Sequence, residues 1–188
     1  MREVVLRVLG LVFLLLLPVG LFLAWDSYRK KELQEIAYKE YEVSKLIRAG
    51  NYSMARELIG TAVKKDSPFK PLLLSYELYM AEHGKEKVEE EKVLKELIEQ
   101  LKSRELLSLY RERYAYHLFK QGKVREALKE LEAIKEEDFN YASALLLRSQ
   151  ILAKEGREKE AKELLKKVRD KDPNSYFANL SQALELAK

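Results

Sequence analysis

Hydrophobic residues follow two different patterns along this chain of 188 residues. Residues 8–25 contain no charge, whereas the later sequence places apolar residues at helical spacing between charged ones. The later pattern predicts helix pairs at about 32–66, 69–102, 104–136 and 140–171, and a final helix at about 174–187. Only 7 Gly and 4 Pro are present, which argues against a turn-rich β fold. We therefore expect an all-α protein.

The uncharged segment predicts a single membrane-spanning helix. Its length corresponds to about 27 Å of helix, close to the ~30 Å hydrocarbon core of a bilayer. Trp25 and Tyr28 follow at its end, where interfacial aromatic residues are common. The alternative is a cleaved signal peptide, but cleavage after Ala24 would leave Phe22 where a small residue is needed. We expect a retained anchor over residues 1–28 and a repeat domain over residues 29–188.

The charges that flank this segment leave its orientation open. Arg2 and Arg7 precede it, whereas Arg29, Lys30 and Lys31 follow it. A count of these charges favours the C-terminal side in the cytoplasm. A short basic head before an apolar run is typical of the opposite orientation.

The charged part of the chain repeats itself after 34 residues. The recurring positions are Gly122, Ala127 and Leu131, which return as Gly156, Ala161 and Leu165. An earlier copy contains Gly50, Ala55 and Ile59, and Gly84 follows Gly50 by 34 residues, before a four-residue slip of the register. Glycine can adopt the left-handed conformation that ends a first helix, and alanine lets two helices cross closely. A period of about 34 residues in helix–turn–helix units is that of the tetratricopeptide repeat (TPR). We expect a right-handed superhelix of about four hairpins closed by a C-terminal capping helix; an ordinary helical bundle is the alternative.

Composition excludes most chemistry. The chain has no Cys and only 2 His, and 35 Lys and Arg are nearly balanced by 31 Asp and Glu. No glycine-rich phosphate loop and no H-E-x-x-H motif occur, and the Glu residues alternate with Lys as on solvated helices. We expect no catalytic residue, no metal, no cofactor and no nucleic-acid partner.

The first helix of each TPR hairpin lines the concave face of the superhelix, so counting back from the glycines predicts a groove. The predicted groove residues are Ile47, Arg48, Leu74, Leu78, Tyr116, Phe119, Lys120, Leu146 and Gln150. This surface is largely apolar with scattered charge, which suits a hydrophobic, extended or helical polypeptide. The alternative is that the final helix or a dimer partner fills it.

Two stretches, FKPLLLSYELYMAEHGK and EEDFNYASALLLRSQILAKEGR, lie in the region that carries a family resemblance, residues 69–170. Together with the leading anchor, this region resembles the YfgM-like family of ancillary SecYEG translocon subunits. The resemblance implies a single-pass protein of the bacterial inner membrane with a periplasmic TPR domain. Such a protein would bind client chains in protein export and contact translocon subunits, a periplasmic chaperone or a prolyl isomerase. Only about seven residues precede the anchor, fewer than the family's cytoplasmic head.

Two other functions remain open at this point. One is a scaffold that organises an envelope or cell-division complex by oligomerising, without binding clients. The other is a membrane scaffold that faces the cytoplasm, which the basic residues 29–31 would allow.

Overall fold

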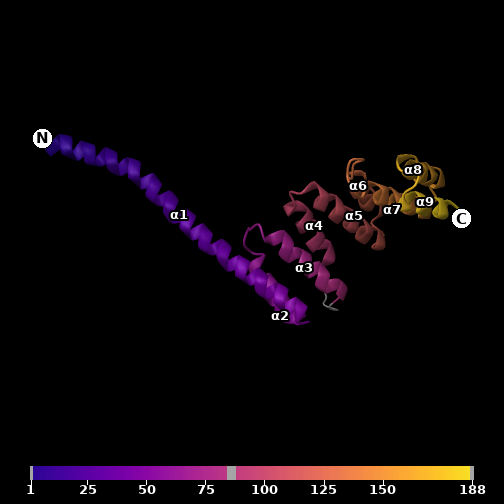
Figure 1. The fold of residues 1–188 in the computed structure, drawn as a ribbon, viewed down its shortest axis with the longest axis horizontal. Coiled ribbons are helices and arrows are strands. Elements are labelled where there is room, and N and C mark those ends of the chain that lie inside the picture. Colours follow the sequence, from indigo (N-terminus) through magenta and orange to yellow (C-terminus); the bar gives the residue numbers. More distant parts are fainter. Residues whose placement is uncertain (1, 84–87, 187–188) are drawn as a thin grey trace. The chain divides into compact units, whose positions relative to one another are not determined.

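The computed structural model describes residues 2–83 and 88–186, with side chains described from Leu14 onward. The described residues form α-helices and contain no strand, as the sequence predicts. The chain divides into two compact units, Met1–Glu86 (unit 1) and Lys87–Lys188 (unit 2). Figure 1 shows the order of the helices within each of them.

Unit 1 contains α1 (Arg2–Arg48), α2 (Tyr52–Ala62) and α3 (Lys70–His83). Helix α2 packs against both α1 and α3, which confirms a hairpin followed by the first helix of the next. The core of the unit consists of Ile36, Val43, Ala55, Ile59, Ala62, Leu73 and Met80. Because α2 contributes to this core at positions 55, 59 and 62, one stripe of the helix faces inward and the rest meets water.

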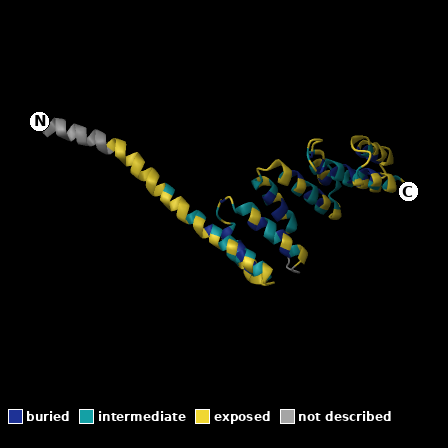
Figure 2. Cartoon of the chain, viewed as in Figure 1, coloured by how far each residue is buried: buried dark blue, intermediate teal, exposed yellow. Residues whose placement is uncertain are grey.

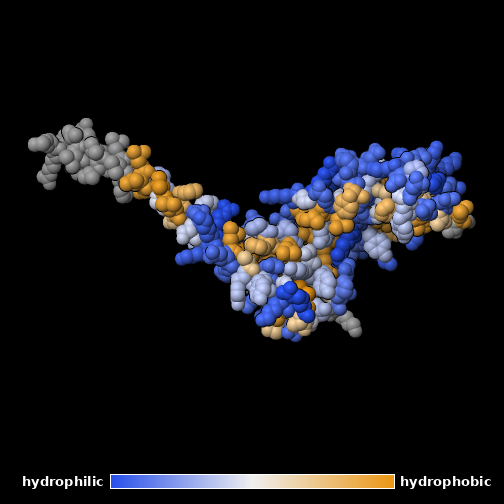
Figure 3. All heavy atoms as spheres, in the orientation of Figure 1, coloured by the Kyte–Doolittle hydropathy of each residue, from blue (hydrophilic) through white to orange (hydrophobic). Residues whose placement is uncertain are grey.

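The first half of α1 lies outside this core. Residues 14–25 are exposed throughout, and the first core residue is Ile36 (Figure 2). Figure 3 shows the apolar surface that these residues present. Over the part of the chain whose residues are described, no helix carries an apolar stretch long enough to cross a membrane. The side chains of residues 8–13, where the predicted anchor begins, lie outside the described part.

Unit 2 contains α4 (Glu90–Gln100), α5 (Arg104–Lys120), α6 (Val124–Glu132), α7 (Tyr141–Lys154), α8 (Glu158–Lys171) and α9 (Tyr176–Leu186). Each helix packs against the next, and α7 also contacts α5 and α9. Helix α9 closes the last hairpin with Phe177, Leu180 and Leu184, as expected of a capping helix. Tyr176, the first residue of α9, is instead exposed and lies edge-on to the Phe177 ring.

The glycines end the first helices in the way the repeat predicts. Gly50, Gly122 and Gly156 have φ values of 75°, 77° and 76°, in the left-handed region. After each glycine, the next residue's amide donates to a carbonyl five residues back, as from Arg157 to Leu152 at 2.9 Å. Gly84, the expected fourth member, lies outside the described residues.

The predicted close packing at the small residues of the repeat is also confirmed. Ala55, Ala127 and Ala161 are buried, where the second helix of each hairpin crosses the first. The predicted hairpin at 69–102 spans the boundary between the units, because α3 belongs to unit 1 and α4 to unit 2. The superhelical sense of the whole chain therefore stays a prediction.

Candidate functional site

A hollow of about 640 Å³ lies between α5, α7 and α9 of unit 2, and we call it the unit 2 groove. Its apolar lining consists of Leu109, Tyr116, Phe139, Leu146, Leu147, Phe177 and Leu180. Three of these side chains are strongly exposed: Leu109 is 44%, Tyr116 is 50% and Phe139 is 64% exposed. The groove thus offers contiguous apolar surface for a ligand to cover.

The groove is built by matching stripes on two helices. The lining positions of α5 are Leu109, Glu112, Arg113 and Tyr116, and those of α7 are Ser143, Leu146, Leu147 and Gln150. Both sets have the spacing i, i+3, i+4 and i+7, which places their members on one helix face. Each α7 position follows its α5 counterpart by 34 residues. The repeat therefore presents the same face twice, side by side.

A small polar network joins the two helices beside the groove. The Glu112 carboxylate accepts hydrogen bonds from Asn140 Nδ2, at 2.6 Å, and from the Ser143 hydroxyl. Asn140 Nδ2 also donates to the backbone carbonyl of Ser108 at 3.0 Å. Asn140 is only 5% exposed, and its Oδ1 atom is buried with no hydrogen-bond partner. This network fixes the start of α7 against the middle of α5.

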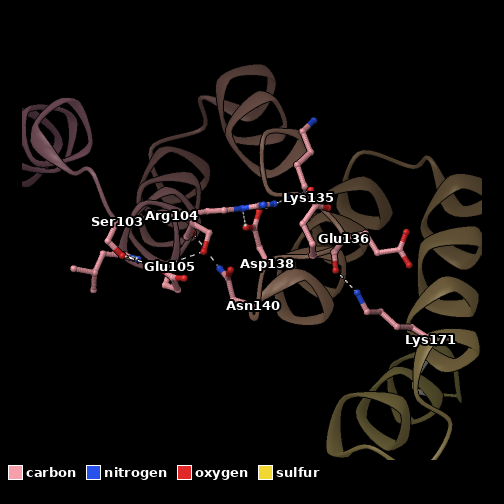
Figure 4. Close-up of polar contacts among 11 residues, drawn as sticks. Ser103, Arg104, Glu105, Lys135, Glu136, Asp138, Asn140 and Lys171 are labelled. Carbon is pink, nitrogen blue, oxygen red and sulfur yellow. Dashed lines mark hydrogen bonds and ion pairs between the residues drawn. The ribbon is translucent and has the colours of Figure 1, made fainter.

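The loop before α7 is held by Asp138, just ahead of Phe139 and Asn140 (Figure 4). One Asp138 oxygen accepts from Arg104 Nε and the other from the Lys135 amide, both at 2.6 Å. Burial alone would raise the pKa of Asp138, but the bonds from Lys135 and Arg104 outweigh it and hold this pKa below its usual value. The ionised carboxylate thus positions the two groove residues that follow it.

Two lysines border the groove at the C-terminal ends of α5 and α7. The Lys120 ammonium lies 6.0 Å from the centre of the Tyr116 ring, and the Lys154 ammonium lies 5.1 Å from that of Phe119. Since Phe119 is on α5 and Lys154 on α7, the second contact crosses between the helices. Neither ammonium group makes an ion pair with a carboxylate of the described residues.

Five of the nine predicted groove residues come together here. Tyr116, Leu146 and Gln150 line the unit 2 groove, Lys120 adjoins it through its contact with Tyr116, and Phe119 follows Tyr116 by three residues on α5. Helix α9 covers part of this face, because Phe177 and Leu180 pack against the cluster that contains Leu146 and form one wall of the groove. The alternative in which the final helix or a dimer partner fills the concave face stays a prediction.

The other four predicted residues belong to unit 1. Ile47 packs partly buried against the unit 1 core, and Arg48 is exposed at the end of α1. Leu74 and Leu78 are buried, at 2% and 0% exposed, as is Leu146 at 4%, so their assignment to a groove stays a prediction. Leu74 and Leu78 lie on a different face of α3 from Leu73 and Met80, which belong to the unit 1 core.

The sequence prediction also missed several lining residues, and two kinds of signal could have found them. Leu109 and Ser143 complete the two helical stripes and are 34 residues apart. Phe139 and Asn140 precede α7, outside the helix faces from which the prediction was counted. An aromatic residue in a polar loop directly before an apolar helix was the available signal.

Metal-binding side chains do not cluster in the described part of the chain, where no group of three or more His, Asp or Glu could hold an ion. The lining of the groove itself is mainly aliphatic and aromatic. Its geometry suits contact with apolar side chains, with a few polar groups fixing the orientation.

Comparisons with known proteins agree with this architecture. The tetratricopeptide-repeat family pattern matches residues 118–184, from the end of α5 into α9. A crystal structure of a TPR protein from Parabacteroides merdae superposes with a TM-score of 0.61 over 81% of this chain, at 18% identity. The chain spans 58% of that structure. The chain thus has a TPR-type helical repeat fold.

A relative of similar length defines the family more closely. An uncharacterized protein of Aquifex aeolicus (strain VF5) is 32% identical over 174 residues, which cover 93% of this chain and 90% of that protein. The chain belongs to the same family as this Aquifex protein.

Proposed function

We propose that the protein is a membrane-anchored adaptor whose unit 2 groove binds segments of other polypeptides during protein export. The observation that carries this proposal is the groove itself, with Leu109, Tyr116 and Phe139 exposed around a hollow of about 640 Å³. Apolar grooves between helices bind extended or helical peptides through a few bulky side chains. The absence of a catalytic motif agrees with a binding role.

The anchor is part of the proposal. Residues 8–25 are uncharged, and those from 14 onward are exposed on α1 without a protein partner in the unit 1 core. The Arg29 guanidinium lies 5.2 Å from the centre of the Trp25 ring. This pairing of an aromatic ring with a cation suits the boundary between hydrocarbon and headgroups. We place the anchor in the bacterial inner membrane and the TPR units on the periplasmic side.

Attachment to the membrane explains how a groove that makes only weak contacts could still bind emerging chains. A receptor confined to the membrane meets chains that emerge beside it at a high effective concentration, so weak contacts suffice. The proposed partners are translocon subunits, a periplasmic chaperone or prolyl isomerase, and unfolded client chains. The resemblance of residues 69–170 to ancillary translocon subunits supports this choice.

A site-specific photocrosslinker at Tyr116 tests the proposal. In membranes that contain an arrested secretory chain, it should crosslink to that chain or to a translocon subunit. The same group at Lys162, an exposed position on α8, is the matched control and should give neither product. Absence of both products at Tyr116, with the protein abundant, would contradict the proposal.

The orientation in the membrane has its own test. Protease added to intact spheroplasts should digest the TPR units. Protection of these units would favour the cytoplasm-facing scaffold.

A second candidate function is a scaffold that assembles through a second copy of the chain. A hollow of about 470 Å³ beside α1 and α2 is lined by Leu46, Leu58 and Met54, which is 61% exposed. Glu42 and Lys45 line it too, so a two-fold contact could pair opposite charges. Sedimentation of the full chain in detergent should then show a dimer that Met54→Glu dissociates. A monomer at every concentration would exclude this candidate.

A further inference from the structure

We infer that the unit 2 groove selects polypeptide segments in which bulky apolar side chains are flanked by Asp or Glu. This inference rests on the proposed function, because it names the chemistry of the segment bound at the same site. It is drawn from the charges around the groove, whereas the proposed function is drawn from its apolar lining.

The first step concerns the position of Lys120 and Lys154. They are 34 residues apart and end α5 and α7, so they occupy the same place in successive hairpins. Both ammonium groups lie over rings of the same helix segment, because Tyr116 and Phe119 are three residues apart on α5. The repeat therefore gathers two positive charges at one end of the groove.

The second step concerns what balances these charges. Elsewhere in unit 2, cations pair directly with carboxylates, as Lys123 does with Glu91 at 2.7 Å. Lys120 and Lys154 have aromatic contacts instead, and no carboxylate of the described residues pairs with either. Two neighbouring cations without anions raise the local positive potential, and an acidic partner lowers their mutual repulsion.

The third step concerns Glu112, the acidic residue in the groove lining. Its carboxylate already accepts hydrogen bonds from Asn140 and Ser143. Arg113, which also lines the groove, contributes a charge of the opposite sign. The lining itself therefore carries one negative and one positive charge, and the two lysines give its C-terminal end a positive charge. A segment with apolar residues at its centre and a carboxylate beyond them complements both the lining and the basic end.

A merely structural role for the lysines makes a different prediction. Both end their helices, where a cation stabilises the partial negative charge of the last carbonyls. In that case, reversing their charge would lower the stability of unit 2 but would not change which peptides bind. The ranking of peptides therefore separates the two roles.

Fluorescence anisotropy with the full chain in mild detergent provides the test. Three peptides share one Leu/Phe core, have blocked termini and carry Glu, Gln or Lys on both sides of the core. At low salt we expect the Glu peptide to bind about three-fold to ten-fold tighter than the Gln peptide, and the Lys peptide to bind most weakly. At about 1 M salt, where the Debye length is about 3 Å, the three affinities should converge.

Charge reversal at the two lysines should invert this order. In K120E/K154E the Lys peptide should bind most tightly, whereas K162E/K166E, with the same net charge but changed on α8, should keep the original order. Circular dichroism checks that each variant is folded. If a variant is unfolded, the salt series on the unaltered chain still tests the inference. Equal binding of the three peptides, or tightest binding of the Lys peptide, would overturn this inference alone. Binding of none would overturn the proposed function as well.

Discussion

Replacing Asn140 with alanine should loosen the contact between α5 and α7. The side chain donates to Glu112 Oε2 at 2.6 Å and to the Ser108 carbonyl at 3.0 Å. A bond to a charged acceptor contributes about 1.5–3 kcal/mol and a neutral one about 0.5–1.5 kcal/mol. Removal of the buried Oδ1, which has no partner, offsets about 1 kcal/mol of this. We expect Asn140→Ala to lower the free energy of unfolding of unit 2 by about 2 kcal/mol.

Guanidinium unfolding followed by far-UV circular dichroism measures this change. With a slope of about 2 kcal/mol per M, the midpoint should fall by about 1 M. Because repeat proteins can unfold in stages, hydrogen exchange should also show faster exchange in α5 and α7 than in α2. Asn51→Ala is the matched control: Asn51 precedes α2, is exposed and makes no side-chain capping bond. If Asn140→Ala shifts the midpoint no more than this control, the network does not join the two helices.

Asn140→Asp tests the same network independently, through the direction in which stability changes with pH. The new carboxylate would face Glu112 in a buried position, so its pKa in the folded protein would lie above its unfolded value. The folded state then binds more protons than the unfolded state as pH falls. The destabilisation relative to the parent chain should be largest near about pH 7 and shrink toward about pH 4. A pH-independent difference would contradict this account of the site.

Two further predictions concern the turns and the loop before α7. Gly156→Ala should lower the free energy of unfolding by about 1 kcal/mol, because Gly156 has a φ of 76°. Gly60→Ala should raise it by about 0.5–1 kcal/mol, because Gly60 lies inside α2 with open space around it. Thermal unfolding measures both changes. The lowered pKa of Asp138 contributes stability that is present above its unfolded pKa, about 4, and is lost as pH falls through the folded value. Asp138→Asn removes the charge that Arg104 contacts, so stability should depend less on pH below about pH 5, measured by acid titration at constant temperature.

The sequence predicted the frame of the fold because a few residue types have strict backbone or packing requirements. Gly122 and Gly156 have positive φ, and Ala127 and Ala161 are buried, each at the expected place in the hairpin. The period of 34 then located α2 to α9 to within a few residues, whereas α1 begins far before the predicted first hairpin and runs unbroken to Arg48. Conformational freedom and small size are properties of single residues, so they can be recognised without knowing what lies opposite.

The groove could not be predicted fully from the sequence, because it depends on which side chains of different helices lie opposite one another. Asn140 precedes an apolar helix and resembles an N-cap, but its side chain makes no capping bond and instead reaches across to Ser108 and Glu112. Leu146 lines the unit 2 groove although it is about as buried as Leu74 and Leu78 and has the same apolar character. Such roles depend on which helix packs against which face, and the spacing of residues along one helix does not show this.

The contrast between α5 and α8 supports the proposal of a partner at the groove. Helix α8 buries its apolar residues, and its outward positions are charged, with Lys162, Glu163 and Lys166 exposed. Helix α5 also has a buried stripe, yet it exposes Leu109 and Tyr116 on another face. Since α8 shows that a helix of this repeat needs only one apolar face to pack, the second apolar face of α5 is not explained by folding. A ligand that covers this face explains why the apolar residues are retained there.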